Sequence, residues 1–132
     1  HHLPMKDASV EGIFCIAVLE HVEDPIRAVA EMHRVLQKDG LVFIYVPFLF
    51  YYHAHGDYYK DYWRFTEHSI RHMCKDFSSV EIVSCRYALE TWLKLSPLGR
   101  FDSVIKAGRF LDNILKKNKT KQVSGFYVLA RK

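Results

Sequence analysis

The chain has 132 residues, of which 49% are hydrophobic and 26% are charged. This length suits one modest domain with its own core, and the composition excludes a disordered, fibrous or disulfide-stapled protein. No apolar run reaches the length of a membrane span, and the chain does not start with a secretory signal pattern.

Charge is spread unevenly along the chain. Residues 1–93 hold 9 Lys/Arg and 13 Asp/Glu, a balance of −4, whereas residues 94–132 hold 10 and 2, a balance of +8. The basic segment 94–132 favours an anionic partner, and the alternative is a solubilising face. The three cysteines, Cys15, Cys74 and Cys85, show no CxxC spacing. They predict buried thiols and a cytoplasmic location.

The stretch 14–21 is the first strong signal along the chain. An apolar run that ends at Glu20-His21 predicts a strand over about Ile13–Leu19, buried on both faces as in a parallel sheet. Ligands of such sheets bind beyond the carboxyl ends of the strands, so Glu20 and His21 stand where a site is expected. The other interpretation is that they only terminate the strand.

A helix is predicted next, followed by a second strand. Asp24 is expected to be the N-cap, Pro25 the first helical residue and Asp39-Gly40 the end, with an apolar stripe at positions 26, 29, 30, 33 and 36. The apolar run 41–46 predicts the second strand, which completes a right-handed βαβ unit. A long loop, 47–65, follows. Nine of its residues are aromatic, which argues for a functional loop rather than disorder.

The second half predicts further helices and two strands. Thr66 is expected to cap a helix with its apolar stripe at positions 70, 73, 74 and 77. A strand near a sheet edge is predicted over 80–87, and the apolar segment 88–95 is helical. Residues 101–115 predict an amphipathic helix and 116–121 a lysine-rich loop. The run 125–130 predicts a last strand, antiparallel to the 80–87 strand.

Several of these motifs together resemble the class I S-adenosylmethionine-dependent methyltransferases of the type-11 kind. The resemblance is carried by LPMKD at 3–7 with EGIF at 11–14, VLEHVEDP at 18–25 and EMHRVLQKDG at 31–40. The segment YYKDYWRFT at 58–66 resembles a motif found in a subset of these enzymes. The match covers roughly residues 1–87.

The resemblance implies an α/β fold with a Rossmann-like methyltransferase sheet, of which this chain supplies the fourth to seventh strands and flanking helices. The family's strand order is 3-2-1-4-5-7-6. Its glycine-rich cofactor loop is expected upstream of His1, and the six glycines here never approach G-x-G spacing. We therefore expect residues 1–132 to be a single partial domain, the acceptor-side half, with residues 96–121 a helical insertion between the last two strands.

The resemblance also assigns candidate site residues. His1 to Met5 are expected to border the adenine of S-adenosylmethionine. The candidate cofactor contacts are His2, Leu3, Pro4, Ile16, Ala17, Val18 and His21. The candidate acid/base groups are His21 and His55, because an imidazole exchanges a proton near neutral pH. The candidate acceptor contacts are Tyr52, His55, Tyr58, Tyr59, Trp63 and Arg64. Alternatively the aromatic loop is packed core, and Arg64 forms a surface pair with Asp61.

The segment 53–57 resembles part of a metal-binding motif. His53-Ala54-His55-Gly56-Asp57 resembles the start of the H-x-H-x-D-H motif of metallo-hydrolases, but Tyr58 replaces the last histidine. We therefore expect no metal here.

The partners expected are a small-molecule or lipid-like acceptor and no specific nucleic acid, with peripheral membrane contact through the basic helix as one option. A second hypothesis is a non-catalytic module that pairs through an exposed strand 13–19, either with another copy or with a separate N-terminal half.

Overall fold

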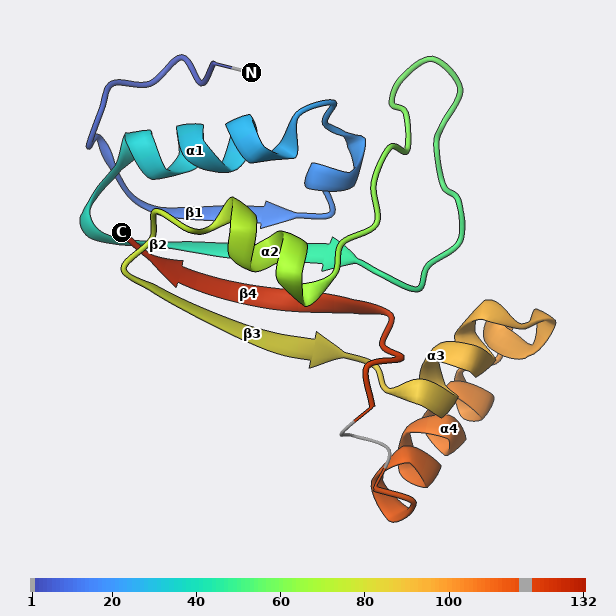
Figure 1. Ribbon diagram of the computed structural model, residues 1–132. Coiled ribbons are helices and arrows are strands. Elements are labelled where there is room, and N and C mark those ends of the chain that lie inside the picture. Colours follow the sequence, from blue (N-terminus) through green and yellow to red (C-terminus); the bar gives the residue numbers. More distant parts are fainter. Residues whose placement is uncertain (1, 117–119) are drawn as a thin grey trace.

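A four-stranded sheet forms the centre of the chain. The structure is a computed structural model that describes residues 2–116 and 120–132. The strands are β1 (Val10–Ile16), β2 (Leu36–Pro47), β3 (Ser79–Cys85) and β4 (Gly125–Arg131), in the order β1-β2-β4-β3 (Figure 1). β1 and β2 are parallel, and β4 is antiparallel to both of its neighbours. This is the order 4-5-7-6, so the predicted partial Rossmann-like sheet is confirmed.

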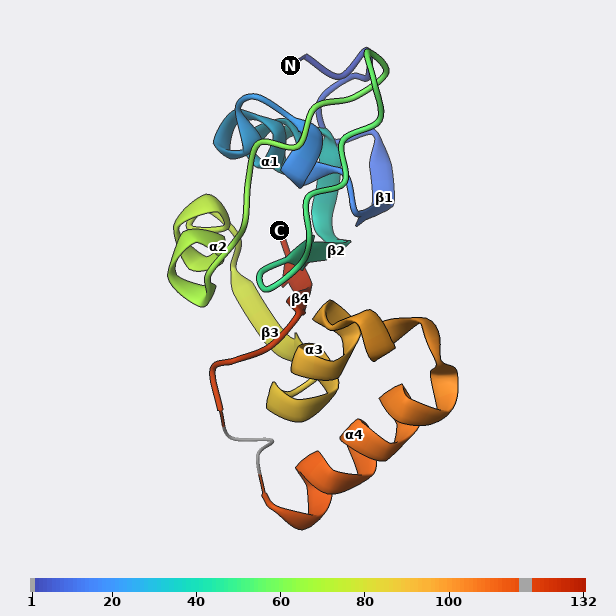
Figure 2. The same ribbon diagram turned by 90° about the vertical axis from the view of Figure 1, so that its right-hand side faces the viewer.

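Two helices cover one face of this sheet. α1 (Pro25–Val35) lies over β1 and β2, and α2 (Glu67–Met73) lies on the same side, as the edge-on view in Figure 2 shows. The core lies between these helices and the sheet. It is built from buried apolar side chains that include Leu19, Val29, Val35, Val42, Ile44, Val46, Phe65, Ile70, Met73, Phe77, Val123 and Val128.

Local sequence sets the starts of both helices. The Asp24 side chain accepts a hydrogen bond from the Arg27 amide at 2.9 Å, and Pro25 follows it, as predicted. Thr66 and Ser69 form a reciprocal capping box at the start of α2. Both predicted N-caps are therefore confirmed.

The predicted end of the first helix is wrong. α1 ends at Val35, because Leu36 turns to extended backbone and pairs with Val10 of β1. The predicted apolar stripe is also partly wrong. Val29 is buried, but Ile26 is 49% exposed and Ala30 is exposed, since Met32 and Val35 complete the buried face instead.

The prediction that β1 is buried on both faces is wrong as well. Cys15 faces the core at 3% exposure, whereas Phe14 is 82% and Ile16 54% exposed, because α1 and α2 lie on one face of the sheet. The strand also ends at Ile16 rather than Leu19. Ala17 adopts a positive φ of 53°, which turns the chain into a 3-10 turn, η1 (Leu19–His21).

A helical hairpin lies between β3 and β4. α3 (Ala88–Leu95), the 3-10 turn η2 (Pro97–Arg100) and α4 (Asp102–Ile114) extend beyond the end of the sheet, and α4 packs mainly against α3 (Figures 1 and 2). Three residues of the predicted lysine-rich loop, 117–119, and residue 1 lie outside the described residues. Within the described chain, no helix is long and apolar enough to cross a bilayer.

Candidate active site

The candidate site lies at the carboxyl ends of the parallel strands β1 and β2. Open α/β sheets bind their ligands at this end because the loops that follow the strands meet there. Here the turn η1 follows β1, and the long loop 48–66 follows β2 (Figure 1). The loop returns onto η1, since the Glu20 carbonyl accepts hydrogen bonds from the amides of Tyr62 at 2.8 Å and Trp63 at 3.3 Å.

Glu20 is the buried acidic group of this site. Its side chain is 1% exposed, and its Oε2 atom has no hydrogen-bond partner among the described residues. Its charge reaches neighbouring groups: burial, together with the nearby Glu20 carboxylate, raises the pKa of the Cys15 thiol to about 11. A buried, incompletely satisfied carboxylate is costly, and such costs concentrate at functional sites.

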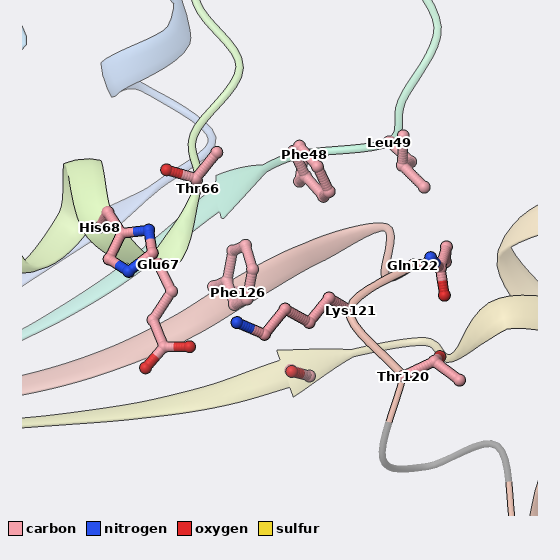
Figure 3. A pocket seen from close by; sticks show the side chains of 10 residues that line it. Phe48, Leu49, Thr66, Glu67, His68, Thr120, Lys121, Gln122 and Phe126 are labelled. Carbon is pink, nitrogen blue, oxygen red and sulfur yellow. The ribbon is translucent and has the colours of Figure 1, made fainter.

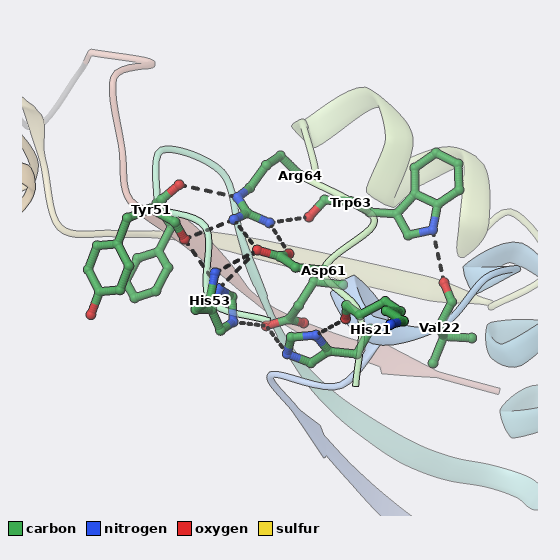
Figure 4. Close-up of polar contacts among 10 residues, drawn as sticks. His21, Val22, Tyr51, His53, Asp61, Trp63 and Arg64 are labelled. Atoms are coloured by element: carbon green, nitrogen blue, oxygen red, sulfur yellow. Dashed lines mark hydrogen bonds and ion pairs between the residues drawn. The ribbon is translucent and has the colours of Figure 1, made fainter. Parts of the chain in front are cut away.

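His21 stands beside Glu20 with a defined orientation. Its Nδ1 lies 2.6 Å from the Lys60 carbonyl oxygen, and its Nε2 lies 3.9 Å from Oε1 of Glu20 (Figure 4). The ring centroid lies 4.5 Å from that of Tyr59 and 4.9 Å from that of His53. The side chain is 16% exposed, so most of the ring is covered and a small part of it reaches solvent.

His53 completes a cluster with these two residues. Its Nε2 lies 3.7 Å from Oε1 of Glu20, while its Nδ1 lies 3.3 Å from Oδ2 of Asp61 and 3.2 Å from the Tyr51 carbonyl oxygen (Figure 4). The sequence placed His53 only in the H-x-H-x-D motif. That motif is not assembled, because His55 and Asp57 are exposed and lie outside the cluster.

Asp61 and Arg64 hold the loop in this shape. Arg64 Nη2 donates to Asp61 Oδ2 at 2.8 Å and to the Tyr51 carbonyl at 2.9 Å, and its Nε donates to the Phe50 carbonyl at 3.3 Å. Asp61 Oδ2 also accepts from the His53 amide at 2.9 Å. These contacts, led by the Arg64 hydrogen bonds, lower the pKa of Asp61 well below its usual range. The expected Arg64–Asp61 pair is thereby confirmed, but its expected place at the surface is wrong, because the Asp61 side chain is fully buried.

The remaining predicted loop residues lie away from the cluster, with the exception of Tyr59. Tyr52 and Tyr58 are 74% and 87% exposed, and His55 stacks against Tyr59 with centroids 6.1 Å apart. Trp63 donates its Nε1 hydrogen to the Val22 carbonyl at 2.9 Å and lines a hollow beside α1 and α2. The structure therefore separates these aromatic residues instead of gathering them into one pocket.

The N-terminal segment lies next to the end of β1. The Leu3 amide donates to Glu31 Oε2 at 3.0 Å, and Arg34 Nη2 donates to the Leu3 carbonyl at 3.1 Å. A hollow of about 200 Å³ brings three of the predicted cofactor residues together; it is lined by His2, Leu3, Val18, Leu19, Val22, Ala28, Glu31 and Met32. Pro4, Ile16 and Ala17 are exposed and do not line this hollow.

A larger hollow lies elsewhere. It has a volume of about 370 Å³ beside the start of α2 and the segment that leads into β4 (Figure 3), and it is lined by Phe48, Leu49, Thr66, Glu67, His68, Ser84, Thr120, Lys121, Gln122 and Phe126. None of the clustered groups Glu20, His21 and His53 borders it. Size alone therefore does not identify the site.

Part of the chain matches a known protein family. Residues 1–44, one third of the chain, match the family model described as "Methyltransferase domain". None of the curated proteins compared with the chain matches it.

Several solved structures resemble the fold of the chain over nearly its whole length. A SAM-dependent methyltransferase from Thermotoga maritima, described as a possible histamine N-methyltransferase, has a TM-score of 0.63 at 16% identity over 99% of this chain and 60% of its own. One from Archaeoglobus fulgidus has a TM-score of 0.59 at 14% identity over 97% and 62%. Phosphoethanolamine N-methyltransferase 2 from Haemonchus contortus, in complex with S-adenosyl-L-methionine, has 0.55 at 13% over 97% and 34%. The chain thus spans about 60% of the first two structures. The matches are consistent with a class I methyltransferase domain, and the fold is a partial one of that class.

Proposed function

We propose that this partial class I methyltransferase fold forms the acceptor-side half of a methyl-transfer site, with S-adenosylmethionine as the donor and a small-molecule or lipid-linked acceptor. One observation carries the proposal: the predicted cofactor residues His2, Leu3 and Val18 border one hollow beside the turn that holds His21. The match of residues 1–44 to the methyltransferase domain model supports the same assignment.

The residues at this edge fit one wall of a cofactor pocket. Leu3 and Val18 present apolar surface, and His2 contributes a flat ring, which together suit one face of a purine. Ile16 and Val18 are 54% and 45% exposed at the end of β1, so their apolar atoms are accessible to a ligand. Pro4 and Ala17 would extend this wall on either side. When bound, the cofactor supplies an electrophilic methyl group on a sulfonium.

His21 is the residue that we assign to the acceptor. The Lys60 carbonyl can only accept a hydrogen bond, so it holds the hydrogen on Nδ1 of His21. In the metal-free chain this leaves the Nε2 lone pair able to take a proton from an acceptor hydroxyl or amine. Tyr59, whose ring lies against that of His21, would form an adjoining apolar wall.

The other loop candidates receive different roles. His55, Tyr52 and Tyr58 are solvent-facing residues that would contact an acceptor only at the rim. We assign Arg64 to positioning, because its guanidinium is already bonded to Asp61 and to two backbone carbonyls of the loop. Trp63 is likewise held against the Val22 carbonyl.

Calorimetric titration with S-adenosylhomocysteine tests the cofactor wall. The substitution Val18→Asp places a charge in the apolar wall, and we expect it to weaken binding at least about tenfold, or about 1.4 kcal/mol. Val83→Asp is the matched control, because Val83 is an exposed valine on β3 at the far edge of the sheet. Equal affinity of the two variants would contradict the assignment of this wall.

A second candidate function, pairing with another strand, is suggested by β1. β1 is an edge strand, and Phe14 and Ile16 expose apolar surface there. An exposed apolar edge favours pairing with another strand. The occupant that we infer is a parallel strand from the rest of a methyltransferase sheet, because the structural relatives are longer than this chain. In its absence a second copy would take that place.

A further inference from the structure

Three potential metal ligands converge beside the candidate acceptor site. One ligand atom each from Glu20, His21 and His53 lies within 4.8 Å of the other two. They come from the turn after β1 and from the loop after β2, and Figure 4 shows the His21 and His53 side chains close together. Two imidazoles and one carboxylate are an established donor set for Zn²⁺ and for other divalent transition metals.

The hydrogen bonds of His21 prepare its other nitrogen for a metal. Its Nδ1 lies 2.6 Å from the Lys60 carbonyl oxygen, which has no hydrogen to give, so Nδ1 is the donor. In the neutral ring Nε2 then carries a lone pair, and this is the atom that faces Glu20. Metal-binding histidines are commonly oriented in this way, through a hydrogen bond from the second ring nitrogen to a carbonyl or carboxylate.

His53 repeats the same arrangement. Its Nδ1 faces Oδ2 of Asp61 at 3.3 Å and the Tyr51 carbonyl oxygen at 3.2 Å, and both atoms accept hydrogen bonds. Its Nε2 faces Oε1 of Glu20 at 3.7 Å. Asp61 is itself fixed by Arg64, so this outer carboxylate is held in place. Two independent outer contacts therefore direct two ring nitrogens toward one point.

The Glu20 carboxylate needs a positive partner. It is 1% exposed, and its Oε2 has no hydrogen-bond partner among residues 2–116 and 120–132. Among the ion pairs of the described residues, Glu20 has only the two histidines. Arg64 interacts with Glu20 only at longer range, because its guanidinium is paired with Asp61. A buried carboxylate that faces two ring lone pairs is unfavourable unless a cation or a proton joins them.

We propose that Glu20, His21 and His53 form a binding site for a divalent metal ion, with zinc as the best match to the ligands. Zinc–ligand distances are about 2.0–2.2 Å, which in a tetrahedral site separates ligand atoms by about 3.4 Å. The two imidazole–carboxylate separations, 3.7 and 3.9 Å, are close to this value, and the two imidazole nitrogens lie within 4.8 Å of each other. His21 and His53 are 16% and 24% exposed, so a fourth position opens toward solvent, where water or an oxygen of a bound molecule completes the site.

Zinc affinity, measured by competition with a chromophoric chelator on the metal-free chain, tests this proposal. We expect one tight site in the unmodified chain. Loss of a ligand should weaken it by more than the roughly 10–100-fold that loss of an outer-sphere partner causes, in each of His21→Ala, His53→Ala and Glu20→Gln. His55→Ala is the matched control, because it removes an exposed histidine two residues from His53, and it should bind zinc normally.

The design separates this site from the other histidines and from folding defects. The chain has eight histidines, so His2→Ala serves as a second control for metal bound at the N-terminus. His53→Ala lies on a surface loop, and its circular dichroism should match that of the unmodified chain. X-ray absorption of the zinc complex should show two imidazole ligands. Absence of tight binding, sulfur ligands or an unchanged affinity in His53→Ala would overturn the proposal. Binding of S-adenosylhomocysteine is a separate measurement, so either result stands without the other.

Discussion

Buried carboxylates in this chain differ in what compensates their charge. Glu90 receives two hydrogen bonds from Arg109, at 2.7 and 3.1 Å. Asp61 is held by Arg64 and by the amide of His53. Glu20 has only imidazoles as ionic partners among the described residues. Since an imidazole can be neutral whereas a guanidinium stays charged, Glu20 is the one of these three carboxylates whose direct ion pairs are least permanent. This difference is what distinguishes a structural ion pair from a candidate site.

The ionisation of Glu31 should make the stability of the fold depend on pH. Hydrogen bonds from Arg34, followed by the Leu3 amide, lower the pKa of Glu31 from 4.5 to about 2. A carboxyl group whose folded pKa is depressed stabilises the fold fully above its unfolded pKa, and this stabilisation is lost as the pH falls through the folded pKa. Stability should therefore decline between about pH 4.5 and pH 2. In Arg34→Met this part of the decline should be smaller, because the largest cause of the lowered Glu31 pKa is removed while the Leu3 amide remains.

Denaturant unfolding at a series of pH values, with an NMR titration of the Glu31 carboxyl carbon, checks this. Arg71→Met is a suitable control, since Arg71 forms an exposed pair with Glu67. An unchanged Glu31 titration in Arg34→Met would disprove the assigned cause.

The hairpin of α3 and α4 is held together in part by polar groups. The Asp112 carboxylate of α4 accepts hydrogen bonds from the amides of Leu89 and Glu90, at 3.0 and 2.9 Å, in the first turn of α3. It thus acts as an N-cap supplied by another helix. Gly108 permits the close approach, because a Cβ atom there would lie 3.1 Å from the Glu90 Cα.

The substitution Asp112→Ala should destabilise this hairpin. It leaves two amides of α3 without their acceptor, and loss of a capping side chain costs about 0.5–2 kcal/mol. Thermal unfolding and hydrogen exchange of the α3 amides measure the effect, with Asn113→Ala as the control because Asn113 is exposed. If exchange of α3 is the same in both variants, the cap has no stabilising role.

At the scale of the whole molecule, the sheet is covered on one face and open along β1. The ring centroid of Phe43 lies 6.0 Å from that of Phe14 and 5.8 Å from that of Tyr127. A row of aromatic rings therefore crosses the uncovered face of the sheet. Exposed apolar surface of this extent is typical of an interface. We therefore expect the isolated chain to self-associate through β1 when no other strand is present.

Sedimentation at rising concentration tests this association. The unmodified chain should form dimers at concentrations above micromolar, and Phe14→Lys should shift it toward monomer, because charge on an edge strand opposes pairing. Val83→Lys places the same charge on β3, at the opposite edge, and should leave association unchanged. A monomer at all concentrations would exclude β1 as an interface between copies.

Much of the fold could be predicted from the sequence, because its signals are local. Asp24-Pro25 and Thr66 carry their own capping groups, and the apolar runs of β2 and β4 have few alternatives to a strand. The exposure of Phe14 and Ile16 could not be predicted, since an apolar run does not reveal which sheet faces are covered.

The cluster of Glu20, His21 and His53 could be predicted only in part. Glu20-His21 stood at a strand end, where a site is expected, but His53 was assigned to a local motif with His55. In the structure His53 faces Glu20, which lies 33 residues earlier in the chain, and no local pattern encodes that contact. The signal for the loop's shape was the Asp61–Arg64 spacing, which was interpreted as a surface pair.

Cofactor binding beside the end of β1 is tested most sharply by an NMR titration of the ¹⁵N-labelled chain with S-adenosylhomocysteine. It follows residue by residue the same binding that calorimetry measures, and it detects weak affinity for a single wall of a pocket. We expect shifts in residues 2–4 and 16–22 and in the α1 residues that line the same hollow, Ala28, Glu31 and Met32, with none in β3 or in the α3–α4 hairpin. Shifts centred on that hairpin, or no shifts at millimolar ligand, would contradict it.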